Sequence, residues 1–206
     1  MSRDRALRAR RTRTVRRPCP PLPDRPALLE EAADWPLDDC VANDDWRQRG
    51  QAVLQFVRRA PDGRRAAVGF VVDLFCLGVR AVHVVLPGPR KRAGLAAVHD
   101  MLDRIGIPGT MRRIDPFLAA KIVRTGASYA RTLGFAPHPD YAWASALIDG
   151  IDDALCDEPV PCGRFGKPVV VPEPGIDLGR LISRLERRVG RGGFHLVAPL
   201  DVLPEG

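Results

Sequence analysis

The chain has 206 residues, 45% of them hydrophobic, and a formal net charge of +7. All of the excess charge lies in residues 1–17, where eight arginines face one acid, so residues 18–206 carry 24 basic and 24 acidic side chains. This balance argues against a nucleic-acid footprint spread over the whole fold. Five cysteines at irregular spacing argue against a disulfide framework or a zinc ribbon and favour a reducing, cytoplasmic location.

Residues 1–26 are expected to form a disordered tail, because repelling arginines and a following run of prolines cannot bury enough apolar surface to offset the entropy of ordering. No apolar segment follows the basic stretch, which distinguishes it from a secretory signal. No run approaches the roughly 18 apolar residues of a membrane-spanning helix, so we expect no membrane partner.

Three interpretations of the basic tail remain open: attachment to nucleic acid or the ribosome, a solvated extension without a function, or a start codon assigned too far upstream. Guanidinium groups pair well with phosphate, so contact with DNA or RNA would depend strongly on salt. The tail lacks aromatic side chains for base stacking, which argues against sequence-specific recognition. The candidate nucleic-acid-binding residues are Arg8, Arg10, Arg11, Arg13, Arg16 and Arg17.

The folded part is expected to span residues 27–206 as one domain. A short helix is predicted over residues 27–33, ending before Trp35, because a residue that precedes proline is pushed out of the helical region. A short strand is predicted over residues 40–43.

The clearest local pattern is an antiparallel hairpin, in which β-rich runs at residues 52–59 and 65–75 flank the turn Ala60-Pro-Asp-Gly63. Proline presets the first turn position, and glycine tolerates a positive φ. A third apolar run, residues 79–86, is expected to extend the sheet. Both faces of the second run are apolar, which is typical of a central strand.

Helical periodicity follows the predicted strands. Leu95, Val98, Leu102 and Ile105 predict one helix, and Asp115 with Pro116 begins a second, which runs to about Leu133. Further predicted elements are a helix from Asp140 to Ile148, a strand over 167–171, a helix capped by Asp177 and a strand over 194–197. Strands first, then helices, predict an α+β fold in which a hairpin-based antiparallel sheet packs against several helices.

Asp73 is the most unusual residue of the predicted core, because a carboxylate in an apolar central strand must meet a cation, several hydrogen-bond donors or a metal, or stay protonated. The favoured interpretation is structural, with Arg80 or a set of loop amides as the partner. The alternative is a catalytic or metal-binding carboxylate.

His138 and Asp140 lie in the stiff loop Pro137-His-Pro-Asp140. We favour a role in building the loop, with Asp140 binding the free amides of the helix that follows. The alternative joins both residues to Asp73 as the catalytic set of a metal-dependent, nuclease-like hydrolase, for which Mg²⁺ or Mn²⁺ would suit the hard oxygen ligands.

Two further features carry weaker hypotheses. Cys76 is predicted on the strand face opposite Asp73, where it would act as a small buried hydrophobe rather than a nucleophile. The loop Cys162-Gly-Arg-Phe-Gly-Lys-Pro168 presents Arg164 and Lys167 and could bind an anion through its amides, although a connecting turn is favoured.

Two motifs resemble those of an uncharacterised family of bacterial proteins with no assigned activity. They are Val72-Asp73-Leu-Phe-Cys76-Leu-Gly-Val79-Arg80 and the segment Gly126-Ala-Ser-Tyr129-Ala-Arg-Thr-Leu133-Gly-Phe-Ala-Pro137-His-Pro-Asp140-Tyr. The resemblance extends over about residues 43–197, and this chain has Phe75 and Arg80 where the family has Tyr and Lys. It implies that the unit of the family is the neutral body, without the tail.

Together these features predict a cytoplasmic accessory or binding protein without a cofactor, in which the tail gives weak, sequence-independent contact with nucleic acid. The metal-dependent hydrolase remains the alternative, so the sequence leaves open whether the protein is an enzyme.

Overall fold

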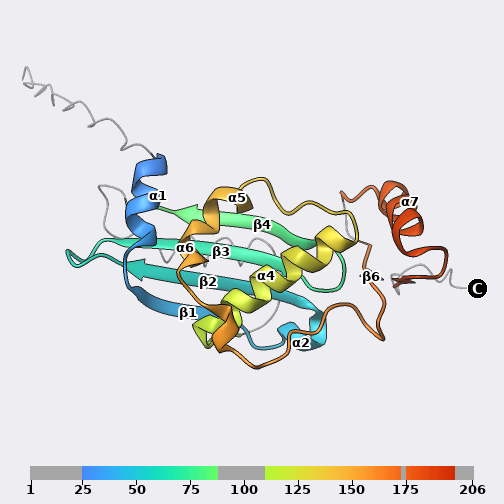
Figure 1. Cartoon of the computed structure of the whole chain (residues 1–206), viewed down its shortest axis with the longest axis horizontal. Helices are drawn as coiled ribbons and strands as arrows, with labels where there is room; N and C mark the ends of the chain where they lie inside the picture. Colours follow the sequence, from blue (N-terminus) through green and yellow to red (C-terminus); the bar gives the residue numbers. More distant parts are fainter. Residues whose placement is uncertain (1–24, 88–109, 173–174, 198–206) are drawn as a thin grey trace, which may run out of the picture.

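A five-stranded antiparallel sheet forms the centre of the protein, in the order β4-β3-β2-β1-β5 (Figure 1). The structure is a computed structural model and describes residues 25–87, 110–172 and 175–197. The strands are β1 Leu37–Asn43, β2 Gln51–Arg59, β3 Arg65–Asp73, β4 Gly78–Val85 and β5 Met111–Arg113. The predicted α+β fold, with a hairpin-based antiparallel sheet packed against several helices, is confirmed.

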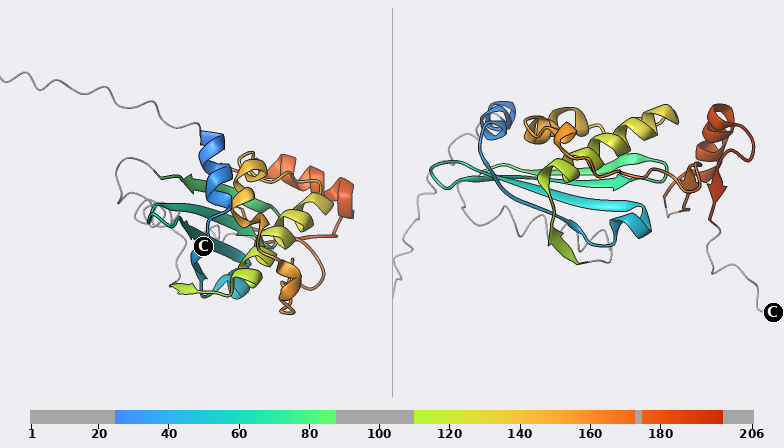
Figure 2. Two further views of the ribbon diagram at one scale, coloured as in Figure 1. Left: turned by 60° about the vertical axis from the view of Figure 1, so that its left-hand side comes forward. Right: turned by 60° about the horizontal axis from the view of Figure 1, so that its bottom comes forward.

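Four helices cover one face of this sheet (Figure 2): α1 Arg25–Ala33, α4 Pro116–Thr132, α5 Tyr141–Ala144 and α6 Ala146–Asp149. The short helix α2, Trp46–Arg49, connects β1 to β2, and the 3₁₀ turn η1, Asp153–Leu155, follows α6. None of the helices within the described ranges is both long and apolar enough to cross a bilayer.

The last part of the described chain forms a small C-terminal lobe, which we define as residues 162–197. It contains β6 Val169–Val170, α7 Leu178–Val189 and β7 His195–Leu196, with β6 and β7 paired in parallel. The lobe lies beyond the β3–β4 turn, at the end of the molecule opposite α1 (Figure 1). Val170, Leu181 and Leu185 of the lobe pack with Cys76 and Leu133 of the body, so the two parts share a hydrophobic cluster.

Strands β2 and β3 are buried on both faces, as the apolar pattern of β3 predicts. Leu54 and Phe70 are fully buried on the face toward the helices, and Val53 and Val71 are buried on the other face. Gln55 also lies on this second face with 1% exposure, and its side-chain amide has no hydrogen-bond partner among the described residues. A buried amide without a partner destabilises a fold.

Helix α4 begins as predicted, because Asp115 accepts a hydrogen bond of 2.8 Å from the Phe117 amide.

The same helix packs close to the sheet at two glycines, Gly126 of α4 and Gly78 of β4. A Cβ atom on Gly126 would collide with Val72, and a Cβ on Gly78 would lie 2.6 Å from the Ala130 Cβ. Helix α4 can pack this closely against β3 and β4 only because neither glycine has a side chain.

Arg58 connects β2 to the helical layer from inside the protein. The side chain is buried, its Nε donates to the Leu147 carbonyl at 2.7 Å, and its Nη1 donates to the Trp35 carbonyl at 2.5 Å. One guanidinium therefore ties the end of α1 and helix α6 to the central sheet.

Several predicted boundaries are wrong. Strand β3 ends at Asp73 rather than residue 75, and the helix expected over 140–148 is split at Ser145 into α5 and α6. The strands predicted over 167–171 and 194–197 shorten to two residues each, whereas β1 begins three residues earlier than expected. The helix predicted from Leu95 to Ile105 lies outside the described residues, as do residues 1–24 of the expected tail.

Candidate functional site

Asp73 builds the tight turn between β3 and β4. Its Oδ1 accepts hydrogen bonds from the amides of Phe75 and Cys76 at 2.8 and 3.2 Å, and its Oδ2 accepts from the Leu77 amide at 3.1 Å. Burial raises the pKa of the carboxyl, while these amides and the charge of Arg80 act in the opposite direction. The structural interpretation with loop amides as partners is confirmed.

The prediction that Cys76 lies on the strand face opposite Asp73 is wrong, because the strand has already ended and Cys76 is part of the turn. Both residues line one pocket. Burial, with the charge of Asp73 as a second cause, raises the pKa of Cys76 to about 12 and that of Cys162 to about 11. Since the thiolate is the reactive form, neither cysteine is set up as a nucleophile at neutral pH.

His138 and Asp140 hold each other and the start of α5. The Asp140 amide donates to His138 Nδ1 at 3.2 Å, and the His138 amide donates to the Val79 carbonyl at 2.8 Å. Asp140 makes no side-chain hydrogen bond to a free helix amide; its Oδ1 accepts from Trp143 Nε1 at 3.1 Å instead. Both residues therefore help to build the loop. The expected helix cap is wrong, because the Asp140 carboxylate accepts its hydrogen bond from the Trp143 indole rather than from a backbone amide.

The three residues of the proposed hydrolase come from two separate loops. Asp73 belongs to the β3–β4 turn, whereas His138 and Asp140 precede α5. Within the described ranges, no three side chains of His, Cys, Asp or Glu converge as a group that could hold a metal ion. Each of the three instead makes the local hydrogen bonds described above.

A groove opens where the central sheet meets the C-terminal lobe. One part, of about 230 Å³, is bounded by Asp73, Cys76 and Leu181. The adjoining part, of about 360 Å³, is bounded by Arg164, Phe165 and His195. Both parts share Arg49, Phe75, Val169 and Val171, so they adjoin, and we refer to them together as the groove. Sequence reasoning missed it, because its walls come from five segments of the chain.

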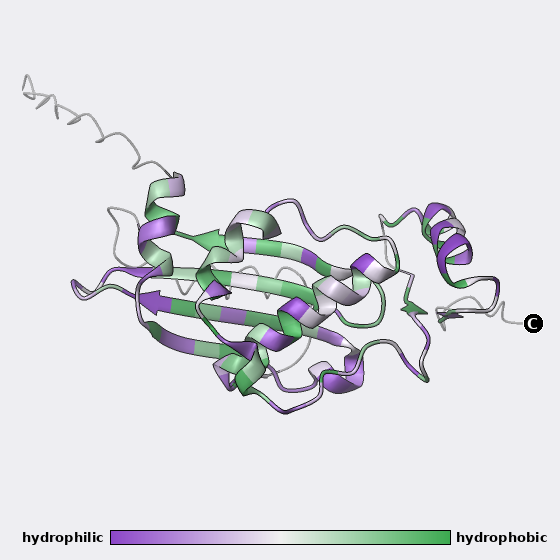
Figure 3. Ribbon diagram, in the orientation of Figure 1, coloured by the Kyte–Doolittle hydropathy of each residue, from purple (hydrophilic) through white to green (hydrophobic). Residues whose placement is uncertain are grey.

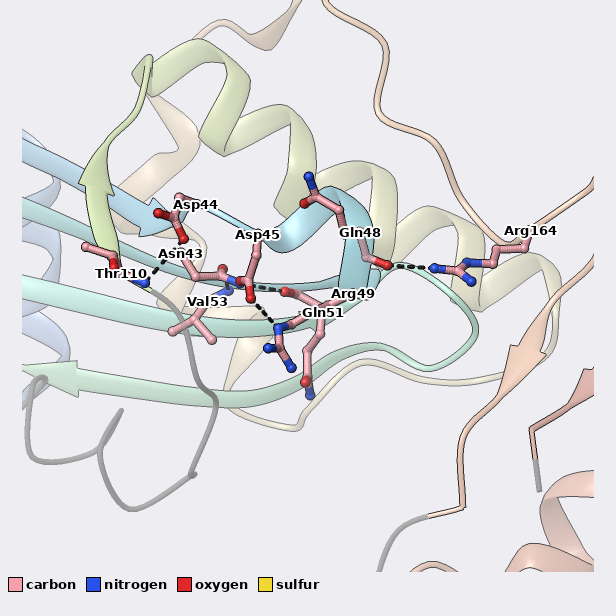
Figure 4. A network of polar contacts seen from close by, with 9 residues as sticks. All are labelled: Asn43, Asp44, Asp45, Gln48, Arg49, Gln51, Val53, Thr110 and Arg164. Carbon is pink, nitrogen blue, oxygen red and sulfur yellow. Dashed lines mark hydrogen bonds and ion pairs between the residues drawn. The ribbon is translucent and has the colours of Figure 1, made fainter. Parts of the chain in front are cut away.

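Helix α2 fixes the cationic rim of this groove (Figure 4). Arg49 forms an ion pair with Asp45, and Arg164 donates to the Gln48 carbonyl at 2.7 Å. Arg164 also lies over the Phe75 ring, 5.0 Å from its centroid. Asp45 in turn accepts a hydrogen bond of 2.8 Å from the buried Asn43 amide.

The side chain of Asn43 holds this corner together, because both its Nδ2 and its Oδ1 are hydrogen-bonded. Its Nδ2 donates to Asp45 and to the Gln51 carbonyl, and its Oδ1 accepts from the Val53 amide at 2.7 Å. Asn43 and Gln55 are thus two buried amides in opposite situations: Asn43 is hydrogen-bonded, and Gln55 has no partner in the part of the chain that the structure describes.

Replacing these two amides by leucine is expected to change stability in opposite directions. Gln55→Leu should raise the free energy of unfolding by about 1 kcal/mol, because an unpaired buried amide is removed, and Asn43→Leu should lower it by about 2 to 3 kcal/mol. Urea denaturation of both variants measures the difference. A loss of stability in Gln55→Leu would mean that its amide is satisfied in solution.

Arg164 and Lys167 lie at the two ends of a tight turn and are hydrogen-bonded to each other. The Arg164 amide donates to the Lys167 carbonyl at 2.8 Å, and the Lys167 amide donates to the Arg164 carbonyl at 3.0 Å. The Lys167 Nζ donates to the Gly192 carbonyl at 2.9 Å, whereas Arg164 donates to Gln48. These two amides are therefore engaged within the turn, and the anion site at this loop stays a prediction.

The neutral body hides a strong separation of charge. Residues 162–197 contain seven basic and three acidic residues, and α7 is predominantly hydrophilic (Figure 3). Within the described part of this lobe, Arg191 with Glu186, 3.9 Å apart, is the one ion pair. The other hydrogen-bonded cations donate to neutral carbonyls, as Arg184 does to Gly134 and Arg188 to Thr132. Their positive charge is therefore not cancelled.

Arginines of the central sheet are paired with acids. Arg59 lies 2.7 Å from Asp38, and Arg112 lies 3.0 Å from Asp44. Arg64 contacts Glu31 at 2.7 Å. The charges of these arginines are thus offset within the body, unlike most of those in the C-terminal lobe.

The two motifs of the family resemblance lie against each other. The first forms the β3–β4 turn, and the second forms the end of α4 with the loop before α5; the His138–Val79 backbone hydrogen bond joins them. The candidate residues of the basic tail lie outside the described residues. A comparison of the chain with protein-family models, curated proteins and solved structures finds no match.

Proposed function

We propose that the protein is an accessory protein that binds nucleic acid through its C-terminal lobe. The basic tail, whose arginine-rich residues 1–17 we call the leader, adds positive charge. The observation that carries this proposal is the unneutralised cationic surface of the lobe. Seven basic residues accompany three acids there; four of the cations donate to carbonyl oxygens, and Arg191 lies 3.9 Å from Glu186. A surface of this kind attracts a polyanion and releases its counterions.

Three exposed arginines of the lobe are suited to phosphate contact. Arg180 and Arg187 lie on the exposed side of α7, and the Arg191 side chain is 91% exposed. They can turn toward a phosphate without disturbing the core, because Leu181 and Leu185 carry the packing of the helix. Contacts of this type position a nucleic acid but do not read its sequence.

The proposal is tested by binding of a labelled 20-nucleotide single strand, as DNA and as RNA, followed by fluorescence anisotropy. The variant Arg180→Gln/Arg187→Gln/Arg191→Gln should bind about tenfold more weakly at 50 mM salt. Its plot of log K against log salt should be shallower by about 2. The leader variant, with all six candidate arginines changed to Gln, should also bind more weakly.

A matched control removes the same number of charges from the central sheet, outside the lobe. Arg59, Arg112 and Arg113 each form an ion pair with an aspartate, and all three changed to Gln should alter binding by less than about threefold. Equal losses in the two triple variants would mean that only net charge matters, which overturns the role of the lobe. Absence of binding by the wild-type protein at 50 mM salt overturns the whole proposal.

A further inference from the structure

Phe165 is presented to solvent at the tip of the turn from Arg164 to Lys167, where the two-residue loop requires a positive φ. It is 93% exposed, and it is the one residue other than glycine with a positive φ, +51°, in the described part of the chain. A bulky residue in this conformation is strained, and an exposed phenyl ring gains nothing from burial. Strain of this kind concentrates where a protein binds a ligand.

The loop that carries Phe165 is held in place by its neighbours. The Gly163 amide donates to the Leu74 carbonyl at 2.9 Å, and the turn from Arg164 to Lys167 is closed by two backbone hydrogen bonds. The hydrogen bond from Arg164 to Gln48 adds a side-chain anchor. The Phe165 ring therefore projects from a turn that hydrogen bonds hold in place.

Exposed apolar side chains gather around this ring. Five large hydrophobic residues are exposed among those described, and four of them belong to the lobe: Phe165, Val171, Leu196 and Val197. His195 lies beside Phe165 edge to face, with the ring centroids 6.4 Å apart. A cluster of exposed apolar groups marks a binding surface, whereas scattered ones do not.

Positive charge borders the same groove. Arg49 and Arg164 line it together with Phe75 and Phe165. A ligand that fits must therefore combine a flat apolar group with negative charge. Nucleotides have this combination, since a base can stack on an aromatic ring while its phosphate meets a guanidinium.

We propose that the groove beside Phe165 binds a base of single-stranded nucleic acid, with Phe165 as the stacking platform and Arg164, which donates to a neutral carbonyl, as the contact for a flanking phosphate. This inference rests on the proposed function, and it adds that unpaired bases are preferred. Single strands are favoured over acidic peptides because the positive charge continues past the groove along α7, where further phosphates of the same strand would be engaged.

The test on the full-length protein compares two single strands with equal backbones, a 20-nucleotide oligo(dT) and the same strand with abasic spacers in place of its bases, and adds a 20-base-pair duplex as a probe without unpaired bases. Wild-type protein should bind oligo(dT) at least about fivefold more tightly than the abasic strand. Phe165→Ala should remove this preference, and Phe165→Trp should retain it. Leu155→Ala, which truncates a 67% exposed leucine outside the lobe, should leave it unchanged.

The outcomes separate this inference from the proposed function. Equal, salt-dependent affinity of wild-type protein for oligo(dT) and for the abasic strand overturns the base site but leaves polyanion binding standing. No binding of any probe at 50 mM salt overturns both. Tighter binding of a labelled peptide of alternating Glu and Tyr than of oligo(dT) assigns the groove to acidic peptides and also overturns the inference.

Discussion

Replacing Arg58 by alanine is expected to lower the free energy of unfolding by about 3 to 5 kcal/mol. The guanidinium is 7% exposed and donates to the carbonyls of Trp35 and Leu147. Alanine would leave both buried carbonyls without these donors and would open a cavity between β2, α1 and α6. Urea denaturation, followed by circular dichroism, measures the loss.

The neighbouring residue provides a matched control. Arg59 also forms an ion pair, with Asp38, but its side chain is 46% exposed. Arg59→Ala should therefore change stability by less than about 1 kcal/mol. Arg58→Lys should fall between the two, because an ammonium keeps the charge but not the forked geometry. Similar losses for Arg58→Ala and Arg59→Ala would show that the buried arginine does not join the layers.

Gly78→Ala is expected to lower the free energy of unfolding by about 2 to 4 kcal/mol, because two separate penalties add. The residue has a φ of +68°, which disfavours a side chain. Its new Cβ would also lie 2.6 Å from the Ala130 Cβ and 2.8 Å from the Gly126 carbonyl oxygen, so α4 would have to move away from the sheet. Thermal and urea denaturation measure the loss.

Gly63 isolates the first of these penalties. It has a φ of +85° in the β2–β3 turn, and a Cβ there would have nothing within 4 Å. Gly63→Ala should therefore lose only about 1 kcal/mol, the conformational part. The difference between the two variants gives the contribution of helix packing, and a difference near zero would mean that α4 adjusts freely.

Elements with strong local signals could be predicted from the sequence. The turn around Gly63 defined the β2–β3 hairpin, and Asp115 with Pro116 defined the start of α4. Strand β5 and helix α2 escaped prediction, because three or four residues carry too little periodicity. Strand β5 is held by its pairing with β1, about 70 residues away in the chain. The predicted end of β3 was two residues too late. The apolar pattern continues to residue 75, but the Asp73 carboxylate accepts hydrogen bonds from the next three free amides and turns the chain there.

The candidate site was predictable only in its structural parts. The interpretation that loop amides hold Asp73 followed from the physical chemistry of a carboxylate in an apolar strand. The groove did not follow, because α2, the β3–β4 turn, the loop at Phe165 and β7 meet only in the folded chain. The charged lobe was hidden by averaging: residues 18–161 and 198–206 carry 17 basic and 21 acidic side chains, and this excess of acids cancels the charge of the lobe in any count over residues 18–206.

The described chain begins at α1, at the far end of the long axis from α7 (Figure 1). The arginine-rich residues 1–17 precede α1 in the chain, so the two cationic elements are attached at opposite ends of the body. Under the proposed function, a protein with this layout would bridge two strands, or two distant stretches of one strand. Its avidity would rise steeply once a target is long enough to reach both ends.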